Sequence, residues 1–464
     1  MNDKTCGSRG PQRATALAVV AAVAVLATAC GAVHVHFGSS RGAAARASAT
    51  ASPPGTAATD CLALPSPCYT PQQLRVAYGI QPLLDRGITG RGQTVVLLEF
   101  PPPATGSPSS VTGAQGPAVT DIRQDLALFD RKFGLPAAPL QVVNTLVPAA
   151  SPWLATGEEV EDTEIVHAVA PDAAIKEVLI PSLDTASSAK ASAAILAALR
   201  LGLVQGGVIS LSADAGEQCF TPAVTAQGNS ILQAAQRDRV TVAFSSGDAG
   251  AAADTCPGAG TGAATVKGAN WPASDPLALA VGGTSLQAAR ATGAYLGETA
   301  WSIPASGGSS PKASGGGFSR LFPRPAYQDG IAGIRATRGV PDVAADADPD
   351  TGMALAFSDG GQDHVFIAAG GTSAAAPLWA AVIALADQYA DRNLGFVNPA
   401  LYQIGRSAYY HEAFHDVTTG TNTVEFPSQT FTGYQAAPGW DPVTGWGSPN
   451  AQVLVPLLAR YASP

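Results

Sequence analysis

The chain has 464 residues, with 26 Lys and Arg against 35 Asp and Glu, which gives a formal net charge of −9. Hydrophobic residues make up 46% of it, so the chain can bury a large core and general disorder is excluded. Its acidic balance and lack of basic blocks argue against nucleic acid as a partner.

The first 30 residues are typical of an export signal. Lys4, Arg9 and Arg13 precede the uncharged run Ala14–Ala29, which is shorter than the roughly 20 residues that span a bilayer comfortably. The run ends in A-T-A-C at Cys30 and resembles a bacterial lipoprotein box. We therefore expect an extracytoplasmic protein. It is either secreted after ordinary cleavage or attached to the membrane through a lipidated Cys30 or an uncleaved N-terminal segment.

Residues 31–59 are rich in Ala, Ser, Gly and Pro, and we interpret them as a linker. The linker contains G-S-S-R-G, which matches the hydrolase motif G-x-S-x-G, but neither a strand before it nor a helix after it supports that function. From residue 60 to residue 464 we expect one large domain.

Four cysteines remain beyond the export signal: Cys61, Cys68, Cys219 and Cys256. An even number in an exported chain indicates two disulfides, and a metal site is disfavoured because no C-x-x-C pattern or neighbouring His supports it. The simplest pairing is Cys61–Cys68 with Cys219–Cys256, although four cysteines allow three pairings.

From Cys61 onward, short apolar runs alternate with amphipathic stretches. The candidate strands are Thr94–Phe100, Gln141–Val147, Ala174–Ile180, Val208–Ser212 and Thr241–Ser245, and the candidate helices are Val119–Phe133, Glu158–Ala168, Ala186–Leu203, Asn229–Arg237 and Ser373–Tyr389. Strands that are apolar throughout and separated by helices predict an α/β fold whose mainly parallel central sheet has helices on both faces. Segments rich in Gly, Pro and Ser predict long loops at 101–117, 249–267, 303–317 and 420–437.

The most specific local motif is G-G-T-S-A-A-A-P at Gly370–Pro377. Its Ser373 stands at the start of a predicted helix, where free N–H groups and the helix dipole favour a developing oxyanion. Subtilisin-like and sedolisin-like peptidases share this serine signature, and a simple helix N-cap is the alternative. A second G-G-T-S lies within Val281–Leu286, but no Ala-rich helix follows it.

A nucleophilic serine needs a base, and the histidine motif H-G-T of subtilisins is absent from the chain. His167, in the matching part of the chain, lacks the glycine. The acidic run Gly157–Glu164 stands there instead, and its Glu158 and Asp162 are neighbours on one helix face. One carboxylate could accept the serine proton while the other positions it. The alternative is a solvated helix start, where acidic side chains are common.

Together these motifs resemble the sedolisins, or serine-carboxyl peptidases, from about Cys61 to the C-terminus. The resemblance is carried by Tyr69–Gly79, Gly87–Phe100, Gly157–Glu164, Ala170–Ile175, Ser245–Gly250, Trp271–Leu286, Ser314–Phe322, Arg338–Gly352, Gly370–Pro377 and Pro438–Pro449, in the family's order. The resemblance implies a subtilisin-like fold and a Ser-Glu-Asp triad.

By this resemblance, Ser373 is the nucleophile, Glu158 the general base and Asp162 its carboxylate partner. Asp248, in S-S-G-D-A-G, corresponds to the family's oxyanion-hole aspartate, and Glu99 corresponds to an acid that often extends the network. An aspartate can stabilise an oxyanion only by donating a hydrogen bond, so it must hold a proton. We therefore expect an acid pH optimum.

The resemblance also implies one structural Ca²⁺ near the C-terminus. Asp416 and Asp441 offer hard oxygen ligands, together with the Val417 carbonyl. The family pattern adds the carbonyls four and two residues before the second aspartate, here Ala437 and Gly439. A pair of turn-capping aspartates is the alternative.

The implied function is an exported, calcium-stabilised, monomeric serine-carboxyl endopeptidase that acts on peptides or proteins at acid pH. A tripeptidyl aminopeptidase and a degenerate, non-catalytic peptide-binding relative are the alternatives. Two features depart from the family pattern. Only the linker 31–59 stands where relatives typically carry a long folded propeptide, and Ala213 stands where they often have Trp.

Overall fold

The computed structural model describes most of the domain predicted from residue 60 onward. The described residues are 68–100, 120–144, 154–155, 157–180, 187–213, 215–256, 266–306, 310–359, 362–367, 370–427 and 429–462. The predicted export signal 1–30, the linker 31–59, Cys30, Cys61 and the predicted loop 101–117 lie outside these residues.

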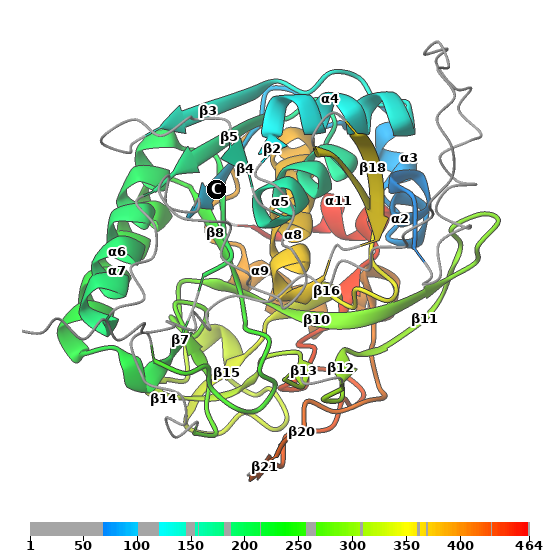
Figure 1. Cartoon of the computed structure of the whole chain (residues 1–464). Helices are drawn as coiled ribbons and strands as arrows, with labels where there is room; N and C mark the ends of the chain where they lie inside the picture. Colours follow the sequence, from blue (N-terminus) through cyan, green and yellow to red (C-terminus); the bar gives the residue numbers. More distant parts are fainter. Residues whose placement is uncertain are drawn as a thin grey trace, which may run out of the picture.

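An eight-stranded sheet forms the centre of the structure (Figure 1). Its strand order is β11 (Tyr295–Ala300), β10 (Leu279–Ala288), β8 (Thr241–Ser245), β6 (Val208–Leu211), β1 (Thr94–Glu99), β5 (Ala174–Leu179) and β3 (Leu140–Asn144), with β16 (Val343–Asp346) also paired to β10. All pairs are parallel except that of β10 with β11. The predicted mainly parallel sheet is therefore confirmed.

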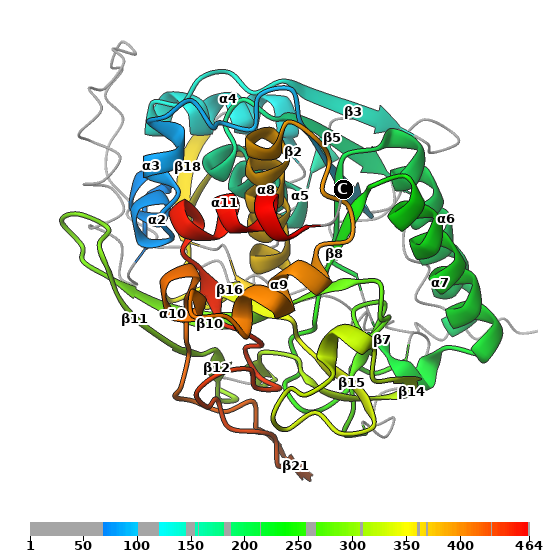
Figure 2. The same cartoon turned by 180° about the vertical axis from the view of Figure 1, so that it is seen from behind.

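Helices cover both faces of this sheet (Figures 1 and 2). One face packs against α6 (Ser188–Gln205) and α7 (Pro222–Arg237), and the other against α4 (Ile122–Phe133), α5 (Gly157–Val169), α8 (Gly371–Ala390) and α11 (Ala451–Tyr461). Strand β1 shows the division, because Val95 and Leu97 join the core on the α8 side while Val96 and Leu98 join the core on the α6 side. The sheet is thus buried on both faces, as its apolar strands predict.

Helix α8 runs through the larger core. Every residue from Gly371 to Asp387 is buried, and the small side chains of its many alanines let it approach β6, β8 and β10 closely. Trp379 anchors the helix by donating a hydrogen bond from Nε1 to the Ala344 carbonyl of β16 at 2.7 Å. The helix start, which carries the predicted nucleophile, is therefore held on a rigid element.

Shorter elements surround this framework. They are α2 (Pro71–Ala77), α3 (Gln81–Leu84), β2 (Thr120–Asp121), β4 (Leu154–Ala155), β7 (Ala215–Gly216), η1 (Glu217–Cys219), β9 (Asn270–Trp271), β12 (Ser302–Ile303), β13 (Lys312–Ala313), β14 (Gly317–Pro323), η2 (Ala326–Gln328), β15 (Thr337–Val340), β17 (Ala354–Asp359), β18 (Gln362–Ile367), α9 (Asn398–Gly405), α10 (Tyr410–Ala413), β19 (Phe414–His415), β20 (Val424–Phe426), β21 (Gln429–Phe431) and β22 (Ser448–Pro449).

The five predicted strands and five predicted helices all exist. Strand β8 has the predicted bounds, the other elements begin or end at a different residue, and residues 145–147 of the predicted strand Gln141–Val147 lie outside the described part of the chain. Helix α7 begins at Pro222 rather than Asn229, because Thr221 caps it by accepting a hydrogen bond from the Val224 N–H. The loops predicted at 303–317 and 420–437 are wrong in part, since the first contains strand β13 and the second contains the β20–β21 hairpin. Strands β10, β11 and β16 were not among the predicted elements.

The predicted Cys219–Cys256 disulfide is present and joins η1 to the segment after β8. Cys68 is also disulfide-bonded, whereas the Cys61 half of the other predicted pairing lies outside the described residues.

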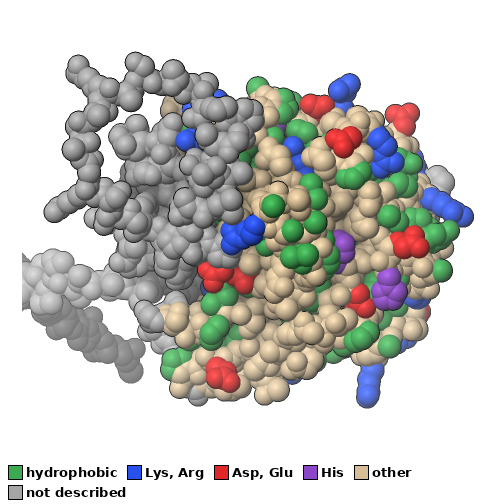
Figure 3. All heavy atoms as spheres, turned by 90° about the vertical axis from the view of Figure 1, so that its right-hand side faces the viewer, with side chains coloured by type: hydrophobic (Ala, Val, Ile, Leu, Met, Phe, Trp, Pro, Cys, Tyr) green, Lys and Arg blue, Asp and Glu red, His purple; other side chains and the backbone are tan. Residues whose placement is uncertain are grey.

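Figure 3 shows one side of the surface, where acidic and basic side chains lie interspersed among hydrophobic and neutral ones. Within the described ranges, no helix has both the length and the apolar character needed to cross a membrane.

Candidate active site

The predicted nucleophile, Ser373, lies in the first turn of α8 and is 6% exposed. The turn before it requires glycine, since Gly371 has a φ of 76° and a Cβ there would lie 2.8 Å from Asp248 Oδ2. Thr372 donates hydrogen bonds from its N–H and its hydroxyl to Asp248 Oδ1 at 2.9 and 3.0 Å. The helix start therefore holds Ser373 beside Asp248.

Helix α5 places its acidic residues in the interior instead of in solvent. Glu159, Glu161, Asp162 and Glu164 are each at most 2% exposed. The alternative of a solvated helix start is therefore wrong. Ionised carboxylates are costly to bury, so burial raises the pKa of Glu161, Asp162 and Glu164.

Glu158 lies near the nucleophile, since the Ser373 side chain is among the groups that act on its carboxyl group. Burial, with repulsion from Glu159 and Asp248, raises the pKa of Glu158 to about 8, while the Ser373 side chain and the positive charge of Lys312 act in the opposite direction. A hydroxyl and a carboxyl group that interact in this way can serve as nucleophile and base.

Asp162 and Glu99 form the next link. Their carboxyl groups are hydrogen-bonded to each other, and the Ser212 hydroxyl donates to Asp162 Oδ2 at 3.4 Å. Burial raises the pKa of both carboxyl groups well above their ordinary values, and the negative charge of nearby Glu158 adds to the rise. Two such groups in contact share one proton, since both cannot ionise together.

Asp248 follows the carboxyl end of β8, and its environment supplies donors. Asp248 Oδ1 accepts the two hydrogen bonds from Thr372, and Lys312 Nζ lies 3.8 Å from Asp248 Oδ2. Sequence reasoning did not single out Lys312, because one lysine in a predicted loop carries no motif. The structure brings it to the site through the pairing of β13 with the segment around Asp248.

Two further buried acids of α5 hold backbone groups. Glu161 Oε1 accepts from the Gly370 N–H at 3.1 Å, and Glu164 Oε2 accepts from the Ala356 N–H of β17 at 2.8 Å. Burial raises the pKa of Glu161 and Glu164 well above the ordinary value. Glu161 thereby fixes the turn that leads to Ser373.

The other candidates lie elsewhere. His167 is at the far end of α5, where its Nε2 contacts Asp130 Oδ1 at 2.9 Å and the Pro136 carbonyl at 2.8 Å. Ser285, of the second G-G-T-S, lies within strand β10 and donates to Asp348. Neither contributes to the group around Ser373.

The predicted calcium residues come together in one loop region. Both oxygens of Asp416 accept from the Gly439 N–H at 3.2 Å, and Asp441 Oδ2 accepts from the Ala437 N–H at 3.2 Å. Within the described residues, no hydrogen bond is found to the carbonyls of Val417, Ala437 or Gly439, and Val417 is only 1% exposed.

Two carboxylates beside three unpaired carbonyls suit a hard cation such as Ca²⁺, so the donor set fits the ion. No group of three or more His, Cys, Asp or Glu side chains among the described residues is placed to hold a metal, so any ion here depends on the backbone carbonyls. Asp441 also caps its own turn, by accepting from the N–H groups of Val443 and Thr444.

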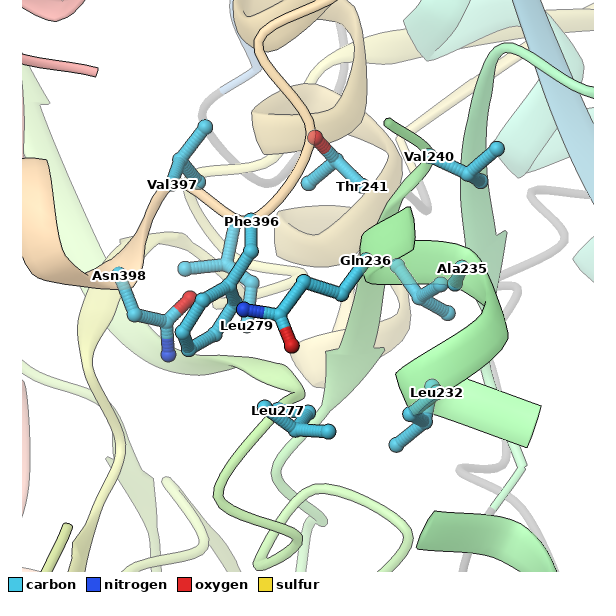
Figure 4. A pocket seen from close by; sticks show the side chains of 11 residues that line it. Leu232, Ala235, Gln236, Val240, Thr241, Leu277, Leu279, Phe396, Val397 and Asn398 are labelled. Atoms are coloured by element: carbon cyan, nitrogen blue, oxygen red, sulfur yellow. The ribbon is translucent and has the colours of Figure 1, made fainter. Parts of the chain in front are cut away.

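A narrow hollow lies away from the group around Ser373, at the amino ends of β8 and β10 (Figure 4). It carries no charged side chain and is lined by Leu232, Ala235, Gln236, Val240, Thr241, Val242, Leu277, Leu279, Phe396, Val397 and Asn398. Glu99 and Asp248, in contrast, stand at or after carboxyl ends of strands, the edge where open α/β sheets bind ligands.

Comparison with known proteins agrees with this architecture. Kumamolisin from Bacillus sp. (strain MN-32) is 33% identical over 406 residues, covering 85% of this chain and 64% of kumamolisin. Tripeptidyl-peptidase 1 from Bos taurus is 33% identical over 253 residues, covering 49% of this chain and 38% of that protein. The chain thus spans less than two thirds of these relatives' length. No family model matches it.

Among solved structures, a Pseudomonas sedolisin, described as a serine-carboxyl proteinase complexed with two molecules of pseudo-iodotyrostatin, superposes with a TM-score of 0.67. The two chains are 25% identical, and the match covers 86% of this chain and all of that one. The subtilisin-like fold expected from the sequence is therefore confirmed.

The buried acids of α5 predict that the fold is most stable in acid. Consider a carboxyl group whose pKa is higher in the folded chain than in the unfolded chain. Its contribution to the free energy of unfolding is fully present below its pKa in the unfolded chain, which is about 4.3 for Glu. That contribution is lost as pH rises through its pKa in the folded chain. Glu164→Gln keeps an acceptor for the Ala356 N–H and removes the ionisation. We expect thermal unfolding of this variant to occur about 1–4 °C above the wild type near pH 7.5, with little difference near pH 4.

The control is Glu425→Gln, which changes an exposed glutamate in the same way. Equal destabilisation of Glu164→Gln at both pH values would contradict this account of the buried acids.

Proposed function

Because the chain belongs to the sedolisin family of serine-carboxyl peptidases, we propose that it hydrolyses peptide bonds through Ser373, Glu158 and Asp162. The observation that supports this most is that the Ser373 side chain, buried in the first turn of α8, acts on the carboxyl group of Glu158. A buried hydroxyl that meets a carboxylate is the pairing that nucleophilic catalysis needs.

In the proposed reaction, Ser373 Oγ attacks the scissile carbonyl while its proton passes to Glu158. Glu158 then gives this proton to the leaving amine, and a water molecule hydrolyses the acyl-enzyme with Glu158 again as the base. Asp162 shares one proton with Glu99, so the pair places one negative charge near Glu158 instead of two.

Asp248 and the Ser373 N–H are the proposed oxyanion donors. The first turn of a helix has N–H groups without acceptors inside the helix, and Ser373 lies in that turn of α8. Asp248 Oδ1 is already occupied by the two bonds from Thr372, so Oδ2 is the oxygen that would carry the donated proton.

The same groups support activity in acid solution. Part of the rise in the pKa of Glu158 comes from the negative charges of Glu159 and Asp248, so Glu158 ionises more easily where its surroundings carry less negative charge. The proton shared by Asp162 and Glu99 is lost as pH rises. The base therefore has to ionise while this pair still holds its proton, which is a condition of acid solution.

We also propose that one Ca²⁺ binds Asp416, Asp441 and the carbonyls of Val417, Ala437 and Gly439. Such an ion would neutralise the two carboxylates and hold the loop between β21 and β22, and it has no role in bond cleavage. Residues 60–464 would form the peptidase domain of an exported protein, secreted or held at the membrane by its N-terminus, that works as a monomer.

Cleavage of a mixed peptide library tests the function. We expect the purified protein, with Ca²⁺, to cut peptides in a profile from about pH 3 to about pH 8 that is highest in acid, and Ser373→Ala to lose at least about 10³-fold in rate. Ser285→Ala is the matched control and should keep the activity.

The cut positions separate the alternatives. Internal cuts indicate an endopeptidase, and removal of three residues from free N-termini indicates a tripeptidyl peptidase. Cleavage near pH 8 with none near pH 4 would contradict the acid mechanism. A folded protein that cuts nothing at any pH would favour the peptide-binding alternative.

Chelation tests the calcium site. We expect removal of Ca²⁺ by a chelator to lower the midpoint of thermal unfolding, and added Ca²⁺ to restore it, because an ion that binds only the folded state stabilises it. Asp416→Asn should abolish most of this response. An equal response to the chelator in Asp416→Asn and in the wild type would place the ion elsewhere.

A further inference from the structure

A buried serine directly after β13 joins its own segment to two others. Ser314 is 0% exposed, and its hydroxyl donates to the Val443 carbonyl at 2.7 Å. The same hydroxyl accepts from the Gly283 N–H of β10 at 2.9 Å. The side chain therefore uses its hydroxyl both as donor and as acceptor, as a buried hydroxyl usually does.

The residues on either side of Ser314 bind the segment that carries Asp248. The Ala313 N–H donates to the Asp248 carbonyl at 2.9 Å. The Gly315 N–H donates to the Gly247 carbonyl at 2.7 Å. These two carbonyls belong to the peptide groups that flank the Asp248 Cα. Both peptide groups are therefore held by the chain neighbours of Ser314.

The segments approach each other at backbone distance. A Cβ on Gly315 would lie 2.6 Å from the Gly247 carbonyl oxygen, and the Ser246 hydroxyl donates to the Gly315 carbonyl at 2.7 Å. On the other side, a Cβ on Gly282 would lie 2.9 Å from Ser314 Oγ. Because the contact is this close, a shift of the segment around Ser314 must also move the segment around Asp248.

The carbonyl to which Ser314 donates lies on a turn with hydrogen bonds of its own. Val443 is 0% exposed, and its N–H donates to Asp441 Oδ1 at 2.7 Å. The Thr444 N–H donates to the same oxygen at 2.9 Å, and the Gly445 N–H donates to the Asp441 carbonyl at 2.9 Å. A turn fixed in this way gives the Ser314 hydroxyl a rigid anchor.

We infer that Ser314 is a positioning residue of the proposed peptidase, whose hydroxyl, by binding Val443 and Gly283, fixes the segment that holds the Asp248 backbone. The inference rests on the proposed function, because it takes Asp248 as an oxyanion donor. Ser314 acts through Asp248 and not on the substrate. A donor that is displaced stabilises the transition state less while the substrate still binds, so the effect should appear in kcat more than in KM.

A double-mutant cycle tests this role. kcat and KM for one cleaved peptide are measured per amount of folded protein in the wild type, Ser314→Ala, Asp248→Ala and the double variant. We expect Ser314→Ala alone to lower kcat by about tenfold or more and to change KM by less than about twofold. In the Asp248→Ala background the same change should lower kcat by less than about twofold, because no donor is left to position. An equal factor in both backgrounds, or an unchanged kcat in Ser314→Ala, overturns the inference.

Ser274→Ala is the matched control. Ser274 is also 0% exposed, and its hydroxyl has no hydrogen-bond partner in the part of the chain that the structure describes. This variant should keep the wild-type kcat. If Ser314→Ala does not fold, Ser314→Cys takes its place in the cycle, since a thiol fills nearly the same space but is a weak donor and acceptor.

Hydrogen exchange gives a readout that does not depend on cleavage. The Ala313 and Gly315 N–H groups bind the Asp248 segment, and the Gly250 N–H donates to the Ala313 carbonyl at 3.0 Å. We expect fragments with these N–H groups to exchange faster in Ser314→Ala than in the wild type and Ser274→Ala, as measured by mass spectrometry. Unchanged exchange overturns the inference. Absence of cleavage in the wild type would overturn the proposed function, and exchange would still decide whether Ser314 holds the Asp248 segment.

Discussion

Burial of carboxyl groups beneath the start of α8 is the constraint on which the rest of the site depends. Charged carboxylates without partners are costly in the interior, so burial raises the pKa of Glu99, Glu161 and Asp162 well above the ordinary values. A carboxyl group that keeps its proton can donate a hydrogen bond, as in the pair of Glu99 and Asp162. The same burial couples the pH range of the chemistry to the pH range in which the fold is stable.

The central sheet makes this burial possible. Helix α8 packs its alanines against β6, β8 and β10, and α5 lies against α8. Glu161 and Glu164 then bind backbone N–H groups of the segments before α8 and in β17, so that the acids also join separate elements. Residues with a chemical role and residues with a packing role therefore share one helix.

Sequence patterns predicted those strands and helices whose own residues form a recognisable apolar or amphipathic pattern. Strand β1 reads T-V-V-L-L-E, and both its faces are buried. Strand β10 contains Gly282 and Gly283, which lower its strand propensity. A Cβ on Gly282 would lie 2.7 Å from Pro341 and one on Gly283 2.6 Å from Ala347, so close packing requires these glycines. That requirement comes from distant parts of the chain and has no local signature.

The same limit applies to the site. The motifs around Ser373, Glu158 and Asp162 could be recognised because each carries its own spacing, and the structure brings them together. The role of burial could not be recognised, since an acidic run reads equally well as a solvated helix start. Lys312 reaches the site only through strand pairing with the segment around Asp248. Local patterns therefore locate the reacting groups, whereas the charges that tune them depend on tertiary contacts.

The most direct test of the central claim is to trap the acyl-enzyme. Wild type and Glu158→Gln would be mixed with an activated peptide ester in acid solution, quenched within the first turnover and digested for mass spectrometry. The account predicts an acyl adduct on the peptide that contains Ser373 in the wild type, and a strongly reduced rate of its formation in Glu158→Gln. An adduct on another residue, or equal acylation rates in the two proteins, would contradict it.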